Sequence, residues 1–512
     1  MQRHKANSVS QSFILLVGTT TITKLLAFVY QAVIAAKMGA NIVTDSYFSA
    51  TEFYTFITAT IFETLVIVLI SRYAAIQAAQ DEKSALRMLS NVMSIVVPIM
   101  LVLGVCLLLG SNIIAVILAP GFTLEQRVVL ARCIRLLAIT PVIYAVFTIY
   151  QAILRQHKQF VMISLESFFI SSVGIVCVLL FSGSSDNADA ITIGYDISMM
   201  LYCLVLFLGA RRYGTVKFQR PKISDDIKII SRGLVPLMIS TGITKIALMI
   251  DKVLASTQGT GVISCLTYAQ MLYYFVITIF IKNMCTVLLT DFVTLCTQKK
   301  LEQMGEKIRK AVSMLTFLLI PTTILTVVFA GEIVSIVFAR GNFRGQNVQT
   351  TAELLGIYAI SFIPAMIQNI YTHVHYAFDD TVAAMRNGII AIGINIGVSM
   401  GLALIIGVNG VAAGTVISAI ISAVFFKQSL RRHLPDYRLF QERKAVARLG
   451  LGTVVCLAVS LAVKLNFIAD DIVVFGAAAI LSFAAFFLIL LLLKEPLIKG
   501  LLMQVSGQKR NC

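Results

Sequence analysis

The stretch Thr20-Thr21-Ile22-Thr23-Lys24 puts a lysine inside an apolar run, and the chain repeats it about 220 positions later as Thr241-Gly242-Ile243-Thr244-Lys245. Each copy lies in a run long enough to cross a bilayer, which takes roughly 20 apolar residues. A lysine in such a span costs about 2.5–3.5 kcal/mol on insertion scales, so it needs a partner, a water-filled cavity or a function. The pair predicts two related halves around one cleft, with a cation on each wall.

The composition is that of a polytopic membrane protein. Of 512 residues, 58% are hydrophobic and 13% are charged, whereas soluble domains have about 45–50% apolar and about 25% charged residues. The net charge of +17 is explained by lysine and arginine in cytoplasmic loops. It does not indicate nucleic-acid binding, because no soluble segment is long enough to form such a domain. The nine cysteines are scattered and have no metal-ligand spacing.

Fourteen apolar runs predict an all-α polytopic membrane protein with fourteen transmembrane helices. The expected spans are 12–36, 46–71, 89–110, 130–153, 160–182, 190–210, 231–255, 263–292, 311–331, 351–374, 385–407, 410–427, 449–467 and 472–493. Basic residues gather in alternate connections, such as 211–232, whereas 182–189 contains none. This bias predicts that both termini are cytoplasmic.

The internal repeat extends beyond the opening motif. Asn112–Gly121 aligns without gaps with Glu332–Gly341, and Ile149-Tyr150 matches Ile370-Tyr371. The offset stays near 220 positions, so each half holds six spans, and spans 13 and 14 are an addition. An even number of spans per repeat gives parallel, pseudo-symmetric repeats, and secondary transporters place their substrate at the interface of such repeats.

This organisation predicts five segments along the chain. They are an N-terminal six-helix lobe at 1–210, a cytoplasmic basic linker at 211–230, a C-terminal six-helix lobe at 231–430, a cytoplasmic basic loop at 431–448, and helices 13 and 14 with a cytoplasmic tail at 449–512. Residues 111–122 and 332–343 are apolar but too short to span, so we expect them to lie along the outer surface.

The motifs resemble those of the bacterial MviN/MurJ lipid II flippases, a family of the multidrug/oligosaccharidyl-lipid/polysaccharide exporter superfamily. The resemblance covers roughly residues 10–430. It rests on Gly39-Ala40-Asn41 with Asp45-Ser46-Tyr47-Phe48-Ser49-Ala50, Ala119-Pro120-Gly121-Phe122, Leu234-Val235-Pro236 with Ile250-Asp251-Lys252, Thr267-Tyr268-Ala269, Arg340-Gly341-Asn342-Phe343 and Tyr376-Ala377-Phe378-Asp379-Asp380-Thr381.

The resemblance implies a flippase of peptidoglycan and cell wall biogenesis, with a role in cell shape, and not an enzyme. It would move lipid II, an undecaprenyl-pyrophosphate-linked glycan, from the inner to the outer leaflet of the bacterial cytoplasmic membrane by alternating access. Sodium or proton coupling is implied, and no other cofactor is expected. The expected partners are the lipid-linked glycan and membrane lipids, with no nucleic acid, and we expect a monomer.

The chain departs from the family at the arginines that usually line the central cavity. Lys24 stands at the first span-1 arginine, Tyr30 at the second and Gln270 at the span-8 arginine. The span-2 arginines are also replaced, although Glu63 keeps the acid that follows them. A flippase for another lipid-linked oligosaccharide, of the O-antigen or exopolysaccharide type, and a cation-coupled drug exporter therefore stay open as alternatives.

Lysines are the leading candidates for substrate binding, because a pyrophosphate needs cations in a wet cavity and an ammonium serves phosphate as a point charge. Lys24 and Lys245 could supply one charge from each half, and Lys252 is a third candidate. The alternative for Lys24 is snorkelling to the membrane interface, and the alternative for Lys252 is an interfacial pair with Asp251.

Acids within the spans form a second set of candidates. Glu52 and Glu63 lie about three helical turns apart on one face of span 2, which we expect to line the cleft and balance the lysines. Tyr30 and Gln270 are expected to contact the substrate as replacements for arginines. Glu166 is a further acid within span 5.

One metal site is implied by the resemblance and another is disfavoured by geometry. In related flippases the span-7 aspartate belongs to a sodium site, and Asp251 matches it, with Asn395 and Thr415 as oxygen donors suited to a hard cation. The alternative, an ion pair of Asp251 with Lys245 or Lys252, is slightly favoured over sodium. His373 and His375 lie two residues apart at the end of span 10 and do not share a helix face, so they are poor joint ligands.

Overall fold

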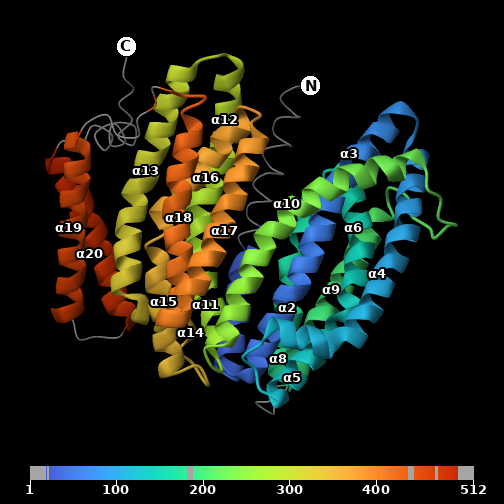
Figure 1. Cartoon of the computed structure of the whole chain (residues 1–512), viewed down its shortest axis with the longest axis horizontal. Coiled ribbons are helices and arrows are strands. Elements are labelled where there is room, and N and C mark those ends of the chain that lie inside the picture. The colour runs from blue at the N-terminus through green and yellow to red at the C-terminus, as the bar shows by residue number, and fades with distance from the viewer. Residues whose placement is uncertain are drawn as a thin grey trace. The chain divides into compact units, whose positions relative to one another are not determined.

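The computed structural model describes residues 19, 22–181, 188–435, 437, 443–466 and 471–493, and these are helical with no β-strand (Figure 1). Thr20, Thr21 and both predicted cytoplasmic tails lie outside the described residues. The chain divides into two compact units, of which unit 1 comprises Met1–Ser264 with Arg340–Arg344, and unit 2 comprises Cys265–Ala339 with Gly345–Cys512. The two predicted six-helix lobes stay a prediction.

Within the described ranges, 12 helices are long and apolar enough to cross a membrane, and a bent pair brings the number to 13 if it is one span. Each expected span from the second to the fourteenth coincides with one of these helices or with the bent pair. The expected first span, 12–36, lies partly outside the described residues, and the part described is a helix over 22–38. The protein is therefore a multi-pass helical protein, and the count of fourteen stays a prediction.

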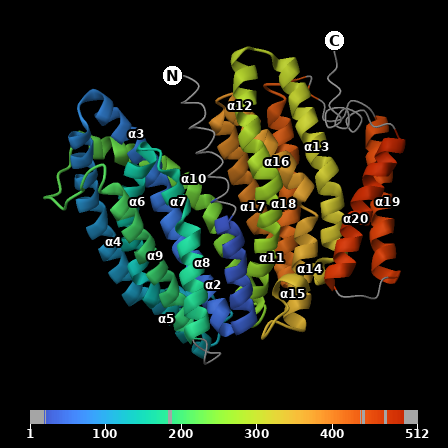
Figure 2. The same ribbon diagram turned by 180° about the vertical axis from the view of Figure 1, so that it is seen from behind.

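Unit 1 is built from helices that include the N-terminal spans and span 7. Its elements are the helix 22–38, α2 (Ile42–Thr58), η1 (Ala59–Glu63), α3 (Thr64–Ala79), α4 (Glu82–Leu118), α5 (Leu124–Leu136), η2 (Leu137–Ile139), α6 (Thr140–Gln156), α7 (Phe160–Ser164), α8 (Glu166–Phe181), α9 (Ala188–Ala210) and α10 (Asp225–Ser256). Helices α4, α6 and α9 lie side by side (Figure 2), around a core that includes Tyr73, Phe147 and Tyr202. Helix α10 packs against α2, η1 and α3.

Unit 2 holds the remaining spans. Its elements are α11 (Val262–Val276, whose first turn belongs to unit 1), η3 (Ile277–Lys282), α12 (Asn283–Thr297), α13 (Leu301–Val328), α14 (Ala330–Phe338), α15 (Gln346–Ala359), α16 (Phe362–Ala377), α17 (Thr381–Ile406), α18 (Val408–Leu430), α19 (Arg443–Asn466) and α20 (Asp471–Leu492). The last two helices lie beside α13 (Figure 1), where Phe317, Cys456 and Phe486 form a buried cluster.

Helix irregularities recur at matching places in the repeat. The π-helical segments η1 and η3 interrupt span 2 and span 8 about 220 positions apart. Span 4 contains the 3₁₀ turn η2, and span 10 bends by 48° between α15 and α16. Pro141 and Pro364 lie in the first turns that follow these breaks, where a missing N–H removes no helical hydrogen bond. The sequence repeat thus extends to the backbone, and π segments often occur at functional positions.

One expectation about the short apolar segments is wrong. Residues 111–118 are not a separate surface helix but the last two turns of α4, which ends at Leu118. Helix α4 continues through Gly110, because an isolated glycine is tolerated inside a helix, and it ends just before Ala119-Pro120. The matching segment in the second half does form its own short helix, α14, after a break at Phe329.

Candidate functional site

A buried ion pair joins α10 to α2 inside unit 1. The Lys252 ammonium lies 2.8 Å from a carboxylate oxygen of Glu52. It also donates a hydrogen bond to the Phe48 carbonyl at 3.2 Å and lies over the Phe48 ring. Lys252 is buried and Glu52 is half-buried. The structure therefore pairs Lys252 with Glu52, and its charge is balanced by the protein rather than left open to an anion.

Asp251 lies next to this pair and is itself buried. Glu52 and Lys252 both act on it electrostatically, and its Oδ1 atom has no hydrogen-bond partner among the described residues. A buried acceptor without a partner loses about 1–3 kcal/mol of solvation, so this oxygen is suited to a proton or a small cation.

The other two predicted sodium ligands lie together in unit 2. The Asn395 amide on α17 donates a hydrogen bond to the Thr415 hydroxyl on α18 at 3.2 Å. The two helices pack closely at this level because Gly414 leaves room for Ser399. Asp251 belongs to unit 1, so within one unit the structure brings together only Asn395 and Thr415. The three-residue sodium site stays a prediction.

Lys24 is a cation within electrostatic range of an acid on another element of unit 1. Its side chain is exposed on helix 22–38, and Lys24 and Glu63 both act electrostatically on Glu166 at the start of α8. Glu63 is also exposed and ends the π segment η1. The Tyr144 hydroxyl donates to Glu166 at 3.4 Å. Glu166 is thus within electrostatic range of both Lys24 and Glu63, and we call Lys24, Glu63 and Glu166 the unit 1 charge cluster.

Lys245 lies on α10, two turns before Asp251. It is half-buried, and no ion pair to it occurs among the residues that the structure describes. One turn earlier, Gly242 lets α10 approach Thr60 of η1, since an added Cβ would lie 3.3 Å from the threonine methyl. Lys245 is thus carried by the part of α10 that packs on the π segment.

The two replaced arginine positions that carry Tyr30 and Gln270 are both buried. The Tyr30 ring packs against Gly174 of α8, and its hydroxyl lies 3.4 Å from the Tyr47 hydroxyl. In unit 2 the Gln270 amide donates a hydrogen bond to the Tyr358 hydroxyl at 3.3 Å. Both side chains contact protein in this conformation, and their predicted contact with substrate stays a prediction.

Sequence reasoning missed a backbone network in which three distant segments of unit 1 meet. The Asp45 carboxylate accepts hydrogen bonds from the Ser264 N–H at 2.8 Å, the Ser264 hydroxyl at 2.6 Å and the Gly261 N–H at 2.5 Å. The Asn342 N–H donates to the Ala36 carbonyl at 2.9 Å. We call these contacts the Asp45 network. The only sequence signal was the position of Asp45 and Asn342 inside motifs that carry the resemblance.

Close backbone approach in this network depends on glycine. Gly341 has φ +57° and Gly261 has φ +86°, and an added Cβ at Gly261 would lie 2.7 Å from the Ala40 carbonyl oxygen. At Gly341 a Cβ would overlap the Ala36 carbonyl oxygen. Only glycine combines the left-handed backbone with such contacts, so the sequence fixes these three segments together.

The chain is similar to known membrane proteins. The sequence profile described as "Lipid II flippase MurJ" matches residues 34–489. A "Probable lipid II flippase MurJ" of Rhizobium meliloti is 21% identical over 437 residues, which cover 83% of this chain and 81% of the relative. A solved "Lipid II flippase MurJ, inward closed conformation" is similar with TM-score 0.78 and 18% identity, over 92% of this chain and 98% of that one.

A more distant solved structure shares the fold. An inward-facing multidrug resistance MATE family transporter of the MOP superfamily has TM-score 0.68 and 14% identity, over 84% of this chain and 99% of that one. The fold alone does not separate these two kinds of transporter. The profile match distinguishes them, because it extends over most of the 512 residues. It shows that the chain belongs to the lipid II flippase MurJ family.

Proposed function

We propose that this chain is a lipid flippase, not an enzyme, that moves lipid II from the inner to the outer leaflet of the bacterial cytoplasmic membrane. The observation that carries the proposal is the family match over residues 34–489. The curated relatives are named as probable lipid II flippases, and their similarity covers most of this chain. Such a carrier serves peptidoglycan synthesis, because lipid II is the lipid-linked precursor of the cell wall.

The transport cycle that we propose is alternating access. Substrate sites of secondary transporters lie at the interface of structural repeats, and the repeats rock to open the site to one side and then the other. The matching π segments η1 and η3 support this cycle, because a backbone irregularity at the same level in each repeat gives both halves a place to bend.

The pyrophosphate of the substrate would bind to lysines of unit 1. Lys24 is exposed and Lys245 is half-buried without an ion pair among the described residues, so both ammonium groups are available to an anion. Glu63 and Glu166 balance Lys24 when no substrate is bound. Lys252 instead holds α10 to α2 through Glu52 and acts as a positioning residue.

Ion coupling and topology complete the proposal. Asp251 would take up sodium or a proton, because its Oδ1 is a buried acceptor without a hydrogen-bond partner among the described residues. Both termini lie in the cytoplasm, since the basic connections alternate with poorly charged ones. The flippase acts as a monomer on lipid-linked glycan in the membrane, with no nucleic-acid partner.

A flippase for another lipid-linked oligosaccharide is the second candidate. The observation that favours it is the burial of Tyr30 and Gln270 against tyrosines, at positions where the family usually has cavity arginines. Replacement of the cavity arginines is expected to change which lipid-linked glycan the cavity binds. A drug exporter for cationic compounds fits less well, because the lysines of the site would repel such a substrate.

The test is depletion of the protein in its bacterial host, followed by a measurement of lipid II on the outer face of the membrane. We expect depletion to block exposure and the wild type to restore it. Lys24→Ala and Lys245→Ala should fail to restore it, whereas Lys37→Ala and Lys228→Ala, which remove exposed lysines from the same two helices, should succeed. Normal exposure on depletion would contradict the lipid II assignment and favour the second candidate.

A further inference from the structure

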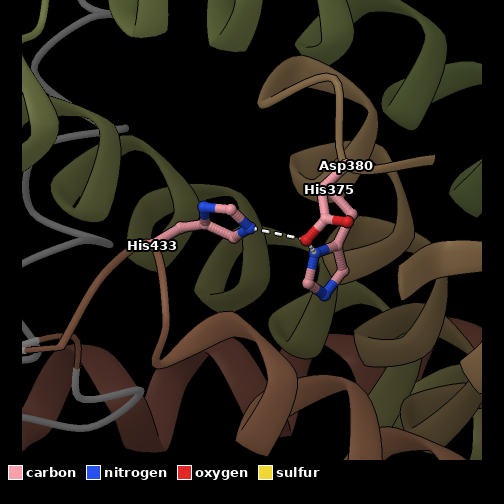
Figure 3. A group of neighbouring side chains, drawn as sticks. All are labelled: His375, Asp380 and His433. Carbon is pink, nitrogen blue, oxygen red and sulfur yellow. Dashed lines mark hydrogen bonds and ion pairs between the residues drawn. The ribbon is translucent and has the colours of Figure 1, made fainter. Parts of the chain in front are cut away.

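Three titratable side chains meet in unit 2 at the ends of three helices. His375 lies in the last turn of α16, Asp380 directly precedes α17, and His433 follows the end of α18. Their nearest ligand atoms all lie within 4.8 Å of one another (Figure 3). The His433 Nε2 atom is 2.8 Å from Asp380 Oδ2, and the His375 Nδ1 atom is 3.8 Å from the same oxygen. Segments more than 50 positions apart thus bring two imidazoles and a carboxylate together.

His375 has unused hydrogen-bonding capacity in a closed environment. Its side chain is 0% exposed, and neither ring nitrogen makes a hydrogen bond of normal geometry within the described part of the chain, although the Phe426 backbone lies close enough to interact with the ring. Buried polar atoms without hydrogen-bond partners destabilise the folded state, because they have lost their contacts with water. The ring points its Nδ1 toward Asp380 and not toward solvent (Figure 3). A ligand between these residues would satisfy His375.

The other two side chains are held in position by their own neighbours. Asp380 uses Oδ1 to accept a hydrogen bond from the Ala383 N–H at the start of α17, which leaves Oδ2 facing the histidines. The hydrogen bond between His433 Nε2 and Asp380 Oδ2 holds this carboxylate oxygen at the centre of the group. The His433 ring stacks on Phe378 at 4.5 Å between centroids, which fixes its plane.

We propose that His375, Asp380 and His433 bind one Zn²⁺ ion. Zinc is bound by histidine nitrogens and carboxylate oxygens at about 2.0–2.2 Å, and where the protein supplies three ligands a water takes the fourth position. Such a tetrahedron separates its ligand atoms by about 3.3 Å, a value between the 2.8 Å and 3.8 Å found here. The two imidazole nitrogens are at most 4.8 Å apart, so side-chain shifts of up to about 1.5 Å would complete the tetrahedron.

The chemistry of the ligands selects the class of metal. Two imidazoles suit zinc and its first-row neighbours, whereas magnesium and calcium favour sites made of oxygen alone. His373, two residues before His375, is not part of the site, because its Nδ1 lies 2.8 Å from the Asn369 carbonyl on its own helix. The pair of histidines that share a helix is thus the wrong pair, and His433 supplies the second imidazole.

Bound zinc would connect the end of α16, the start of α17 and the end of α18. Because the site contains none of the residues assigned to substrate or coupling ion, it does not depend on the proposed transport function. Its effect would be on the stability of this helix end, since any ligand that binds only the folded state stabilises it.

The experiment uses the full-length protein in detergent, with any affinity tag removed and metals stripped by EDTA. Zn²⁺ is titrated against a competing chromophoric chelator. We expect one ion per chain, and affinity at least about tenfold weaker in His375→Ala, His433→Ala and Asp380→Asn. The matched control His373→Ala should bind as the wild type does. Asp380→Asn keeps the helix cap, because asparagine caps about as well as aspartate.

Two further measurements distinguish the loss of zinc binding from the misfolding of a variant. Zinc should raise the unfolding temperature of the wild type and of His373→Ala, but not that of the three ligand variants. Cobalt in place of zinc should give the visible absorption bands of a tetrahedral site, and these should vanish in His433→Ala. Equal zinc affinity in all variants, or no zinc binding by the wild type, would overturn the proposal.

Discussion

The ammonium of Lys252 lies 2.8 Å from the carboxylate of Glu52, which joins span 7 to span 2 across 200 positions of sequence. The lysine is buried, so its charge depends on this partner and on the Phe48 carbonyl. A charge with such partners is a poor receptor for an incoming phosphate, because the anion would have to displace the carboxylate. This separates Lys252 from Lys24 and Lys245, although all three are lysines within apolar runs.

The pair predicts a specific pattern of stability. Glu52→Gln should destabilise the protein by about 3 kcal/mol, because removing one partner leaves the other charge buried and uncompensated. The double variant Glu52→Gln/Lys252→Met should recover most of that loss, since no buried charge remains. Thermal unfolding in detergent measures both. As a control, Asp225→Asn removes the exposed partner of Lys228 and should change stability by less than about 0.5 kcal/mol. A double variant no more stable than Glu52→Gln would contradict the interpretation.

Gly341 and Gly345 offer a matched pair of substitutions in one loop. Their φ values are +57° and +58°, so alanine is strained at either position, and the ψ of −123° at Gly345 lies outside the left-handed region open to alanine, which makes Gly345 a stringent control for strain. An added Cβ at Gly341 would overlap the Ala36 carbonyl oxygen, whereas at Gly345 it has nothing within 4 Å. We expect Gly341→Ala to abolish lipid II exposure in depleted cells and Gly345→Ala to retain it. Equal effects of the two substitutions would show that strain, and not the close approach in the Asp45 network, limits function.

The helices could be predicted well from the sequence, and the reason is physical. A bilayer demands long apolar runs, and every expected span from the second onward falls on a described helix or on the bent pair. The contacts among charged residues could not be predicted. Glu52 and Lys252 carry no sequence signal that pairs them, and the expected partner of Lys252 was its neighbour Asp251.

Two further features depend on three-dimensional proximity. The π segment at Ala59–Glu63 has an ordinary apolar sequence, so nothing in its composition distinguishes it from regular helix. The relation of His375 to His433 depends on how α18 ends beside α16, and the local spacing of His373 and His375 pointed away from a metal site. Local patterns predicted elements, and tertiary packing decided which side chains meet.

The Asp45 network predicts a graded response to substitution. Asp45 accepts three hydrogen bonds, two of them from backbone N–H groups that have no other acceptor in these contacts. Asp45→Ala leaves buried donors unpaired and should cost about 3 kcal/mol, while Asp45→Asn keeps one acceptor oxygen and should cost less. Unfolding temperature and lipid II exposure should fall in the same order. Ser46→Ala, a buried neighbour whose hydroxyl has no hydrogen-bond partner among the described residues, is the control and should be close to neutral. Equal losses of unfolding temperature and lipid II exposure in Asp45→Ala and Asp45→Asn would show that the hydrogen bonds are not the cause.

Substitutions at Lys24, in the unit 1 charge cluster, test whether this lysine binds the substrate through its charge or through its exact geometry. Arginine keeps the charge but spreads it over a planar fork, whereas glutamine keeps only the approximate size. If the ammonium binds pyrophosphate as a charge, Lys24→Arg should support lipid II exposure and Lys24→Gln should reduce it at least about tenfold, as expected for loss of a charged contact worth about 1.5 kcal/mol or more. Lys37→Gln, at an exposed position later in the same helix, should have no effect.

Glu166→Gln leaves Lys24 with one fewer carboxylate and should strengthen binding of the anionic head group, measured as a lower concentration of lipid II analogue at half-saturation of the purified protein. Full activity of Lys24→Gln would show that Lys24 does not bind the pyrophosphate. Because Lys252 is paired with Glu52, the pyrophosphate would then be assigned to Lys245, which has no ion pair within the described residues.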